Sequence, residues 1–311
     1  GCEGGSFYAT EKTLVIENAT SVRRMATTNP SELLRIIQDV SIKGRAPKQG
    51  PLMLALALAI VNAPNKEAKD NALNAIQTEC GIPTHLAMFL NFYQAARKQK
   101  SQSTGWGRAF KRAVNFWFDS KTGSKLAMQL TKYASREGWT MKDIITKSHP
   151  NPTKLKSGVA LALHHAVQST KPKPEITDSN RPVQEFLNAV DEVKTLTDDG
   201  DITRVCELVE KYGLVREHLN TSLLNYPAVW EQLLHKMPHE AMMRNLGKMT
   251  SIGVFESECV DLVVRRLIDK KALLKSRLHP LKILVASEVY SRGKGIKGDL
   301  SWLPVPKIVS A

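Results

Sequence analysis

The segment WGRAFKRAVNFWF, Trp106 to Phe118, decides the fold class because its apolar residues recur with the period of an α-helix. The spacing i, i+4, i+7, i+8, i+11 is the core-facing stripe of an amphipathic helix. The residues that follow it are Trp106, Phe110, Ala113, Val114 and Trp117. The mixture of aromatic and basic residues also suits a surface that stacks on RNA bases. The helical spacing favours the core for the aromatic side chains.

The opposite face of this predicted helix is basic. It carries Arg108, Lys111, Arg112 and Asn115, and no acidic residue occurs before Asp119. We therefore predict a solvated cationic stripe, and we take its three cations as candidate contacts to a polyanion.

The same period of about 3.6 residues continues along the 311-residue chain, whereas the alternation of a β-strand is almost absent. Only Phe7 to Glu17 has strand character, which predicts a small N-terminal hairpin. Residues 169–180 predict a long polar loop. The predicted helices cover residues 29–43, 51–63, 67–80, 84–99, 106–119, 123–137, 140–148, 157–169, 182–196, 201–211, 227–236, 239–250, 256–270 and 279–291. Helix pairs that recur roughly every 35–45 residues predict an all-α, HEAT-like helical-repeat array, with residues 1–311 as one domain.

Charge is unevenly placed along the chain, whose formal net charge is +14. Residues 93–156 hold 14 Lys and Arg against 3 Asp and Glu, and residues 265–311 hold 11 against 3. Residues 157–264, by contrast, hold 10 basic and 16 acidic residues. This clustering predicts a field that attracts a polyanion, because a generally soluble basic surface does not require it.

A second basic face is predicted on the next helix, residues 123–137. Lys125, Gln129, Lys132 and Arg136 follow i, i+4, i+7, i+11 without a carboxylate among them. Cations in the last turn of a helix interact favourably with its negative end, and Gly138 is well placed to end this helix. That interaction explains Lys132 and Arg136, but not Lys125 or the preceding basic helix. An external anion such as an RNA phosphate explains all of them and makes binding salt-dependent.

A short helix follows, with Thr140 as its N-cap and Asp143 at its N3 position. His149 ends this helix beside Pro150. A histidine in such a place is by default a polar surface residue. In this basic neighbourhood it is also a candidate to stack on, or hydrogen-bond to, a nucleotide.

Enzyme and membrane signatures do not occur in the sequence. HExxH, GxSxG and P-loop motifs are missing, and the eight histidines are dispersed. GKGIKG, Gly293 to Gly298, has GxGxxG spacing but follows a predicted helix, so we interpret it as a basic loop. The longest apolar run, Leu52 to Val61, is too short to cross a membrane. The four separated cysteines predict reduced thiols in an intracellular protein.

The motif TKYxxRxGWxxKD, Thr131 to Asp143, and the SH that follows it resemble the TROVE module, the region shared by telomerase-associated, Ro and vault proteins. Further motifs add to the resemblance to the Ro ribonucleoprotein family and run in collinear order over the chain. They are the opening GCEGGSFY, WGRA, LVREHL, RNLGKMT, HPLKILVA and GKGIKG.

The resemblance implies a ring or horseshoe of HEAT-like repeats that binds RNA without catalysis and without a cofactor. Ro proteins bind small noncoding Y RNAs on the outer surface, and single-stranded 3′ ends of misfolded noncoding RNAs enter a basic central cavity. The family's Y RNA contacts fall on Lys132, Arg136 and His149. No family motif identifies the cavity lining. Our assignment of the basic face of residues 106–119 to it therefore rests only on the charge pattern of those residues. We expect a monomeric protein of ribonucleoprotein assembly and RNA quality control in the cytoplasm, with a nuclear pool left open.

The chain also departs from the family pattern. Ro proteins continue into a von Willebrand A-type domain with a metal-coordinating DxSxS motif, which this sequence lacks. The chain has no initiator Met, so we expect a fragment that ends before that domain, with an open or strained ring and no metal. The main alternative is a protein-interaction scaffold, because helical arrays often present concave protein-binding surfaces. An RNA-processing enzyme is disfavoured because no acid–base or metal cluster is evident.

Overall fold

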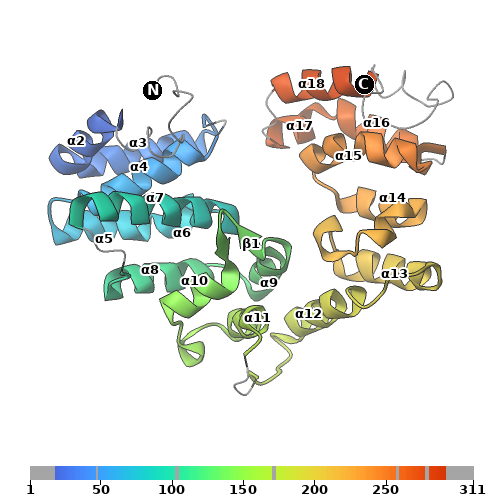
Figure 1. Cartoon of the computed structure of the whole chain (residues 1–311), viewed down its shortest axis with the longest axis horizontal. Coiled ribbons are helices and arrows are strands. Elements are labelled where there is room, and N and C mark those ends of the chain that lie inside the picture. The colour runs from blue at the N-terminus through green and yellow to red at the C-terminus, as the bar shows by residue number, and fades with distance from the viewer. Residues whose placement is uncertain are drawn as a thin grey trace. The chain divides into compact units, whose positions relative to one another are not determined.

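The computed structural model describes residues 18–46, 48–101, 105–169, 173–256, 259–276 and 280–291, and these are mainly α-helical (Figure 1). The predicted N-terminal hairpin and the GKGIKG loop lie outside the described residues. The helices are α2 (Thr20–Thr28), α3 (Pro30–Ile42), α4 (Gly50–Val61), α5 (Lys66–Asn74), α6 (Ile76–Glu79), α7 (Pro83–Ser101), α8 (Arg108–Asp119), α9 (Gly123–Lys132), α10 (Met141–Ser148), α11 (Ser157–Val167), α12 (Arg181–Val193), α13 (Ile202–Tyr212), α14 (Pro227–Lys236), α15 (His239–Ser251), α16 (Cys259–Ile268), α17 (Lys270–Ser276) and α18 (Pro280–Ser291). The all-α prediction is confirmed.

A single small sheet accompanies the described helices. It consists of β1 (Ser135–Arg136) and β2 (Trp139–Thr140), which pair antiparallel between α9 and α10. Within the described part of the chain, no helix is both long and apolar enough to cross a membrane.

The chain divides into two compact units, Gly1–Leu187 and Asn188–Ala311. In the first unit, α4 is the central helix and packs against α2, α3, α5 and α7. Its sequence GPLMLALALAIV is apolar nearly all round, and most of its side chains are buried. A helix without a polar face has to be covered on every side, which explains why four helices surround α4.

Aromatic side chains hold α8 against α7. The rings of Tyr93 and Phe110 stack with centroids 4.0 Å apart, and Phe89 stacks on both. Trp106 meets Phe110 edge-on at 5.1 Å. The predicted core stripe is confirmed, because Phe110, Ala113, Val114 and Trp117 are buried and Trp106 is half-buried.

Two glycines allow α9 to cross closely over α11. A Cβ on Gly123 would lie 2.7 Å from backbone atoms of Gly158, a distance that no side chain tolerates. The helices therefore approach at backbone contact, and this crossing sets the position of α9.

The second unit is built around α13, α14 and α15. Trp230 of α14 is fully buried, and its indole nitrogen donates to the carbonyl of Leu224 at 2.9 Å. Arg266 of α16 donates to the carbonyls of Leu234 and Met237 and so adds hydrogen bonds at the C-terminal end of α14.

Some predicted helix boundaries are wrong. The predicted helix 67–80 is divided at Ala75 into two helices, α5 and α6. The predicted helix 123–137 ends at Lys132 and gives way to the hairpin. The helices α2 and α17 were not predicted, since each is short and has few apolar residues at helical spacing.

Candidate nucleic-acid interface

Lys132 and Arg136 meet at the ring of Tyr133. The Nζ of Lys132 lies 5.4 Å from the ring centroid, and the Cζ of Arg136 lies 5.1 Å from it. Arg136 also donates to the carbonyl of Ser135 at 2.7 Å and reaches the carbonyl of Lys132 at 3.5 Å. The aromatic face of Tyr133 thus holds both cations, at about 0.5–1 kcal/mol for each exposed cation–π contact, and backbone carbonyls also hold Arg136.

The predicted continuous stripe through Lys125, Gln129, Lys132 and Arg136 is wrong. Gln129 is buried, and its side-chain amide donates to the carbonyl of Gly81 at 3.1 Å. Arg136 lies in β1, beyond the end of α9. The cations therefore occupy two separate places, one at each end of α9.

Gly138 turns a hairpin and does not end a helix. Glu137 and Gly138 have φ angles of 53° and 80°, and the pairing of Arg136 with Trp139 places both residues in a two-residue turn. Such turns require positive φ, which glycine adopts without strain. The chain leaves α9 at Tyr133 instead, whose φ is −116°.

Asn91 of α7 fixes this hairpin. Its amide nitrogen donates to the carbonyl of Glu137 at 2.9 Å, and its amide oxygen accepts from the indole nitrogen of Trp139 at 2.9 Å. Trp139 is buried, and the Nζ of Lys147 lies 4.9 Å from its ring centroid. The backbone of Arg136 is thereby positioned from α7 and α10.

The basic face of α8 is exposed in the way the sequence predicts. Arg108 and Arg112 are exposed, and Lys111 is half-buried. Arg108 is the first residue of α8, and the first turn contains no acidic residue. A cation at a helix N-terminus is unfavourable by about 0.3–1 kcal/mol, so helix stability does not explain it.

Lys125 repeats this arrangement in the first turn of α9, which also lacks an acidic residue. Its side chain is exposed. Its charge acts on Lys121, a buried lysine just beyond α8, whose pKa is lowered to about 7 by burial and then by Lys125. The end of α8 and the start of α9 therefore hold neighbouring cations.

His149 ends α10 in a left-handed conformation with φ 51°, and its side chain is exposed. The predicted N-cap at the other end is confirmed, because Thr140 and Asp143 form a reciprocal capping box. The hydrogen bond from Thr140 lowers the pKa of Asp143. Asn115 of α8 donates to the carbonyl of Ser148 at 3.2 Å, so His149 follows a direct contact between α8 and α10.

We call the predicted set the basic cluster: Arg108, Lys111, Arg112, Lys125, Lys132, Arg136 and His149. Two junctions connect the elements that carry it. Asn115 joins α8 to the residue before His149, and Trp139 joins the hairpin to α10 through Lys147 and to Trp106 at 6.0 Å. Figure 1 shows α8, α9, α10 and β1 close together in the first unit.

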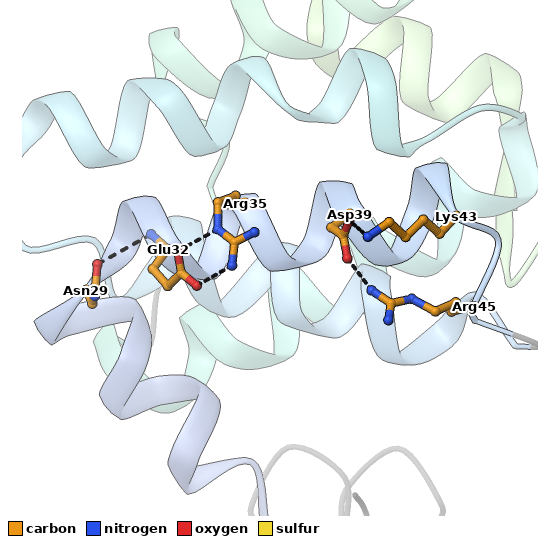
Figure 2. A network of polar contacts seen from close by, with 6 residues as sticks. All are labelled: Asn29, Glu32, Arg35, Asp39, Lys43 and Arg45. Carbon is orange, nitrogen blue, oxygen red and sulfur yellow. Dashed lines mark hydrogen bonds and ion pairs between the residues drawn. The ribbon is translucent and has the colours of Figure 1, made fainter.

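The cations of α3 and of the residues just after it provide an internal comparison. Figure 2 shows Arg35 paired with Glu32 at 2.6 Å, Lys43 paired with Asp39 at 2.6 Å, and Arg45 also paired with Asp39. These hydrogen bonds and charges lower the pKa of both carboxyl groups. Arg35 on α3, and Lys43 and Arg45 just after it, therefore have carboxylate partners.

The basic cluster differs in this respect. Considering only the residues that the structure describes, none of its six Lys and Arg side chains forms an ion pair. Asp143 is engaged by Thr140, and the carboxylate of Asp119 accepts from the backbone N–H of Lys156 at 3.0 Å. The charge of the cluster is thus left for an external anion.

Sequence reasoning missed several residues of this neighbourhood. Asn91 and Lys121 carry no local signal, because their roles depend on contacts across the fold. Tyr133 lies inside the quoted TKYxxR motif, and helical spacing predicts it on the apolar side of residues 123–137, with no prediction that its ring contacts Lys132 and Arg136. Phe116 is 59% exposed, and its position on the polar side of the stripe was readable from the spacing.

The TROVE domain model matches residues 1–294 of this chain. The chain is 30% identical over 370 residues to RNA-binding protein RO60 of Caenorhabditis elegans, a match that covers 100% of this chain and 58% of that protein. It is 31% identical over 314 residues to RNA-binding protein RO60 of Deinococcus radiodurans, covering 100% and 56%.

The fold is similar to the crystal structure of the Deinococcus radiodurans Ro (Rsr) protein, with a TM-score of 0.76 and 29% identity. That similarity covers 100% of this chain and 58% of the solved chain, so the chain spans little more than half the length of these relatives. The collinear motifs, the all-α fold and the match over residues 1–294 agree, and the chain belongs to the TROVE domain family.

Proposed function

We propose that this chain binds RNA through the basic cluster on α8, α9, α10 and the β1–β2 hairpin. The observation that carries the proposal is the difference between two sets of exposed or half-buried cations. Arg35, Lys43 and Arg45, on and just after α3, have carboxylate partners, whereas the six in the basic cluster have none among the described residues. The two similar proteins from Caenorhabditis elegans and Deinococcus radiodurans, both RNA-binding proteins, support the same ligand class.

The ligand is small noncoding RNA, and binding does not involve catalysis. RNA of this kind is recognised through phosphates, 2′-hydroxyl groups and unpaired bases. The resemblance to Ro proteins makes Y RNAs the ligands of Lys132, Arg136 and His149, and makes single-stranded 3′ ends of misfolded RNAs a second ligand class. The protein acts as a monomer in ribonucleoprotein assembly and RNA quality control, in the cytoplasm.

Salt-dependent binding tests the proposal with two paired substitutions. The variants are Lys132→Gln with Arg136→Gln, and Arg108→Gln with Arg112→Gln. Each should weaken binding of a Y RNA and reduce the slope of log affinity against log salt by about 0.7–0.9 for every phosphate interaction that the substitution removes. Fluorescence anisotropy between about 50 and 200 mM salt measures both quantities.

The matched control removes two cations that have carboxylate partners, Arg35→Gln on α3 with Lys43→Gln just after it. It changes the net charge by the same amount, so it should leave affinity and slope close to those of the unsubstituted chain. Equal losses of affinity in the control and in the cluster variants would show that total charge, not the cluster, determines binding. Full affinity in both cluster variants would remove this surface from the proposal.

A further inference from the structure

Phe116 is an aromatic side chain that the fold leaves in solvent. Its exposed fraction is 59%, while its neighbours Trp117 and Phe118 are fully buried. Among the residues whose side chains the structure describes, no other Phe, Tyr or Trp is exposed to this extent. Full burial of a phenylalanine side chain is worth about 1.5–3 kcal/mol, so a ring left this exposed offers apolar surface to a ligand.

The surroundings of Phe116 are cationic. Arg112 precedes it by one helical turn and is therefore its neighbour on the helix surface, and Arg108 lies one turn before Arg112. Both arginines are exposed and belong to the basic cluster. The carboxylate of Asp119, one turn later, accepts from the backbone N–H of Lys156, whose ammonium donates to the Asp119 carbonyl at 2.6 Å.

Phe116 also lies beside the junction that positions His149. The preceding residue, Asn115, donates to the carbonyl of Ser148, and His149 follows Ser148. Phe116 and His149, two residues with exposed rings, thus each directly follow one partner of this hydrogen bond. The imidazole of His149 has no hydrogen-bond partner among the described residues.

We propose that Phe116 is a stacking platform for an unpaired RNA base, with Arg112 and Arg108 contacting the flanking phosphates. The proposal rests on the RNA binding proposed above and assigns part of that surface to single-stranded RNA. A single exposed aromatic ring can stack on one RNA base, while the cations around it, which have no carboxylate partners, can contact the phosphate backbone. A protein partner would require a larger apolar patch, whereas the residues one turn away from Phe116 are the polar Arg112, Asp119 and Ser120 and the buried Ala113.

The test compares single-stranded oligouridine with a fully paired RNA duplex, for the variants Phe116→Ala and Phe116→Trp. Phe116→Ala should weaken binding of the single strand by roughly 5- to 100-fold without changing its salt slope, because stacking involves no counterion release. Binding of the duplex should not change, since its bases are already stacked. Phe116→Trp should retain affinity, and its added fluorescence should be quenched by the single strand.

Ile42→Ala is the matched control, because Ile42 is a 75% exposed apolar residue at the end of α3, beside Lys43, which has a carboxylate partner. It should bind both RNAs normally. Unchanged single-strand affinity in Phe116→Ala, or an equal loss for duplex and single strand, overturns the platform. If the Arg108 and Arg112 variants still lose binding in that case, RNA binding stands and only the platform fails. If the unsubstituted chain binds neither RNA, the proposed function itself fails.

Discussion

At the scale of single residues, Lys121 is the most unusual charge near the basic cluster. Only 6% of the residue is exposed, its Nζ donates to the carbonyl of Trp117 at 2.9 Å, and it lies 3.4 Å from the centroid of the Trp117 ring. Burial is the main cause that lowers its pKa from 10.5 to about 7, and the charge of Lys125 adds to it. The π face and the carbonyl compensate only part of the lost hydration.

This lowered pKa makes stability depend on pH with a definite sign. Above about pH 7 the folded chain loses the Lys121 proton, whereas the unfolded chain retains it up to about pH 10.5. The unfolded state therefore binds more protons in this range, and stability rises with pH, by at most about 1.4 kcal/mol per pH unit. Lys121→Met should be more stable than the unsubstituted chain at pH 6, and that advantage should shrink by pH 8.

Urea unfolding at pH 6, 7 and 8 measures the difference in unfolding free energy between the two proteins. His85, whose pKa is lowered by burial, contributes equally to both and cancels in the difference. The window ends at pH 8 because burial raises the pKa of the Cys80 thiol, which introduces the opposite sign near pH 9. A constant difference across the window would mean that Lys121 stays protonated in the folded chain.

Sequence alone predicts the residues of this neighbourhood unevenly. Helical spacing correctly predicts the burial of Phe110 and Trp117, because each residue of an amphipathic helix has its side fixed by its neighbours in sequence. It also predicts the exposure of Arg108 and Arg112. It cannot predict Lys121, because a lysine after a helix is ordinarily solvated and its burial depends on how α8 packs in the fold.

At the scale of elements, the hairpin between α9 and α10 is held in place from α7. Asn91 supplies both a donor to Glu137 and an acceptor for Trp139, across 46 and 48 residues of sequence. This contact is why the predicted helix 123–137 is wrong. Locally, Gly138 fits the end of a helix as well as a hairpin turn, and only the long-range partner distinguishes the two. The fold class was predictable from local periodicity, but this boundary was not.

Asn91→Ala should loosen the hairpin and weaken RNA binding without removing any charge. The substitution leaves the buried indole N–H of Trp139 without its acceptor, which costs about 1–3 kcal/mol. The Trp139 indole hydrogen should then exchange faster with solvent, as NMR can measure. RNA affinity should fall while the salt slope stays nearly constant, because the cations remain but Arg136 is less well positioned.

The control for this prediction is Asn74→Ala at the exposed end of α5. It removes the same amide from a helix of the same unit, and Trp139 exchange and RNA affinity should be unaffected. If Asn91→Ala speeds indole exchange yet binds RNA normally, the hairpin does not need to be rigid for binding. The role of Arg136 would then rest on its charge alone.

At the scale of the whole molecule, the net positive charge is larger than folding requires, and it is concentrated in particular segments of the chain. The net charge is +14, and residues 93–156 contribute 14 basic against 3 acidic residues. Self-repulsion of this kind destabilises a compact chain, whereas a bound polyanion relieves it and releases counterions. The acidic segment 157–264, with 10 basic and 16 acidic residues, contributes nothing to that attraction.

The chain purified from cells at low salt should therefore carry nucleic acid. The ratio of absorbance at 260 to 280 nm should exceed that of the protein alone. It should fall after a wash at about 1 M salt, because the Debye length is then only about 3 Å and interactions between exposed charges are screened. Ribonuclease should lower the ratio and deoxyribonuclease should not, because unpaired bases and 2′-hydroxyl groups distinguish RNA. The variant with Arg108→Gln and Arg112→Gln should retain less RNA than the variant with Arg35→Gln and Lys43→Gln. A low ratio together with a co-purifying protein would instead support the scaffold alternative, with the basic cluster facing an acidic protein surface.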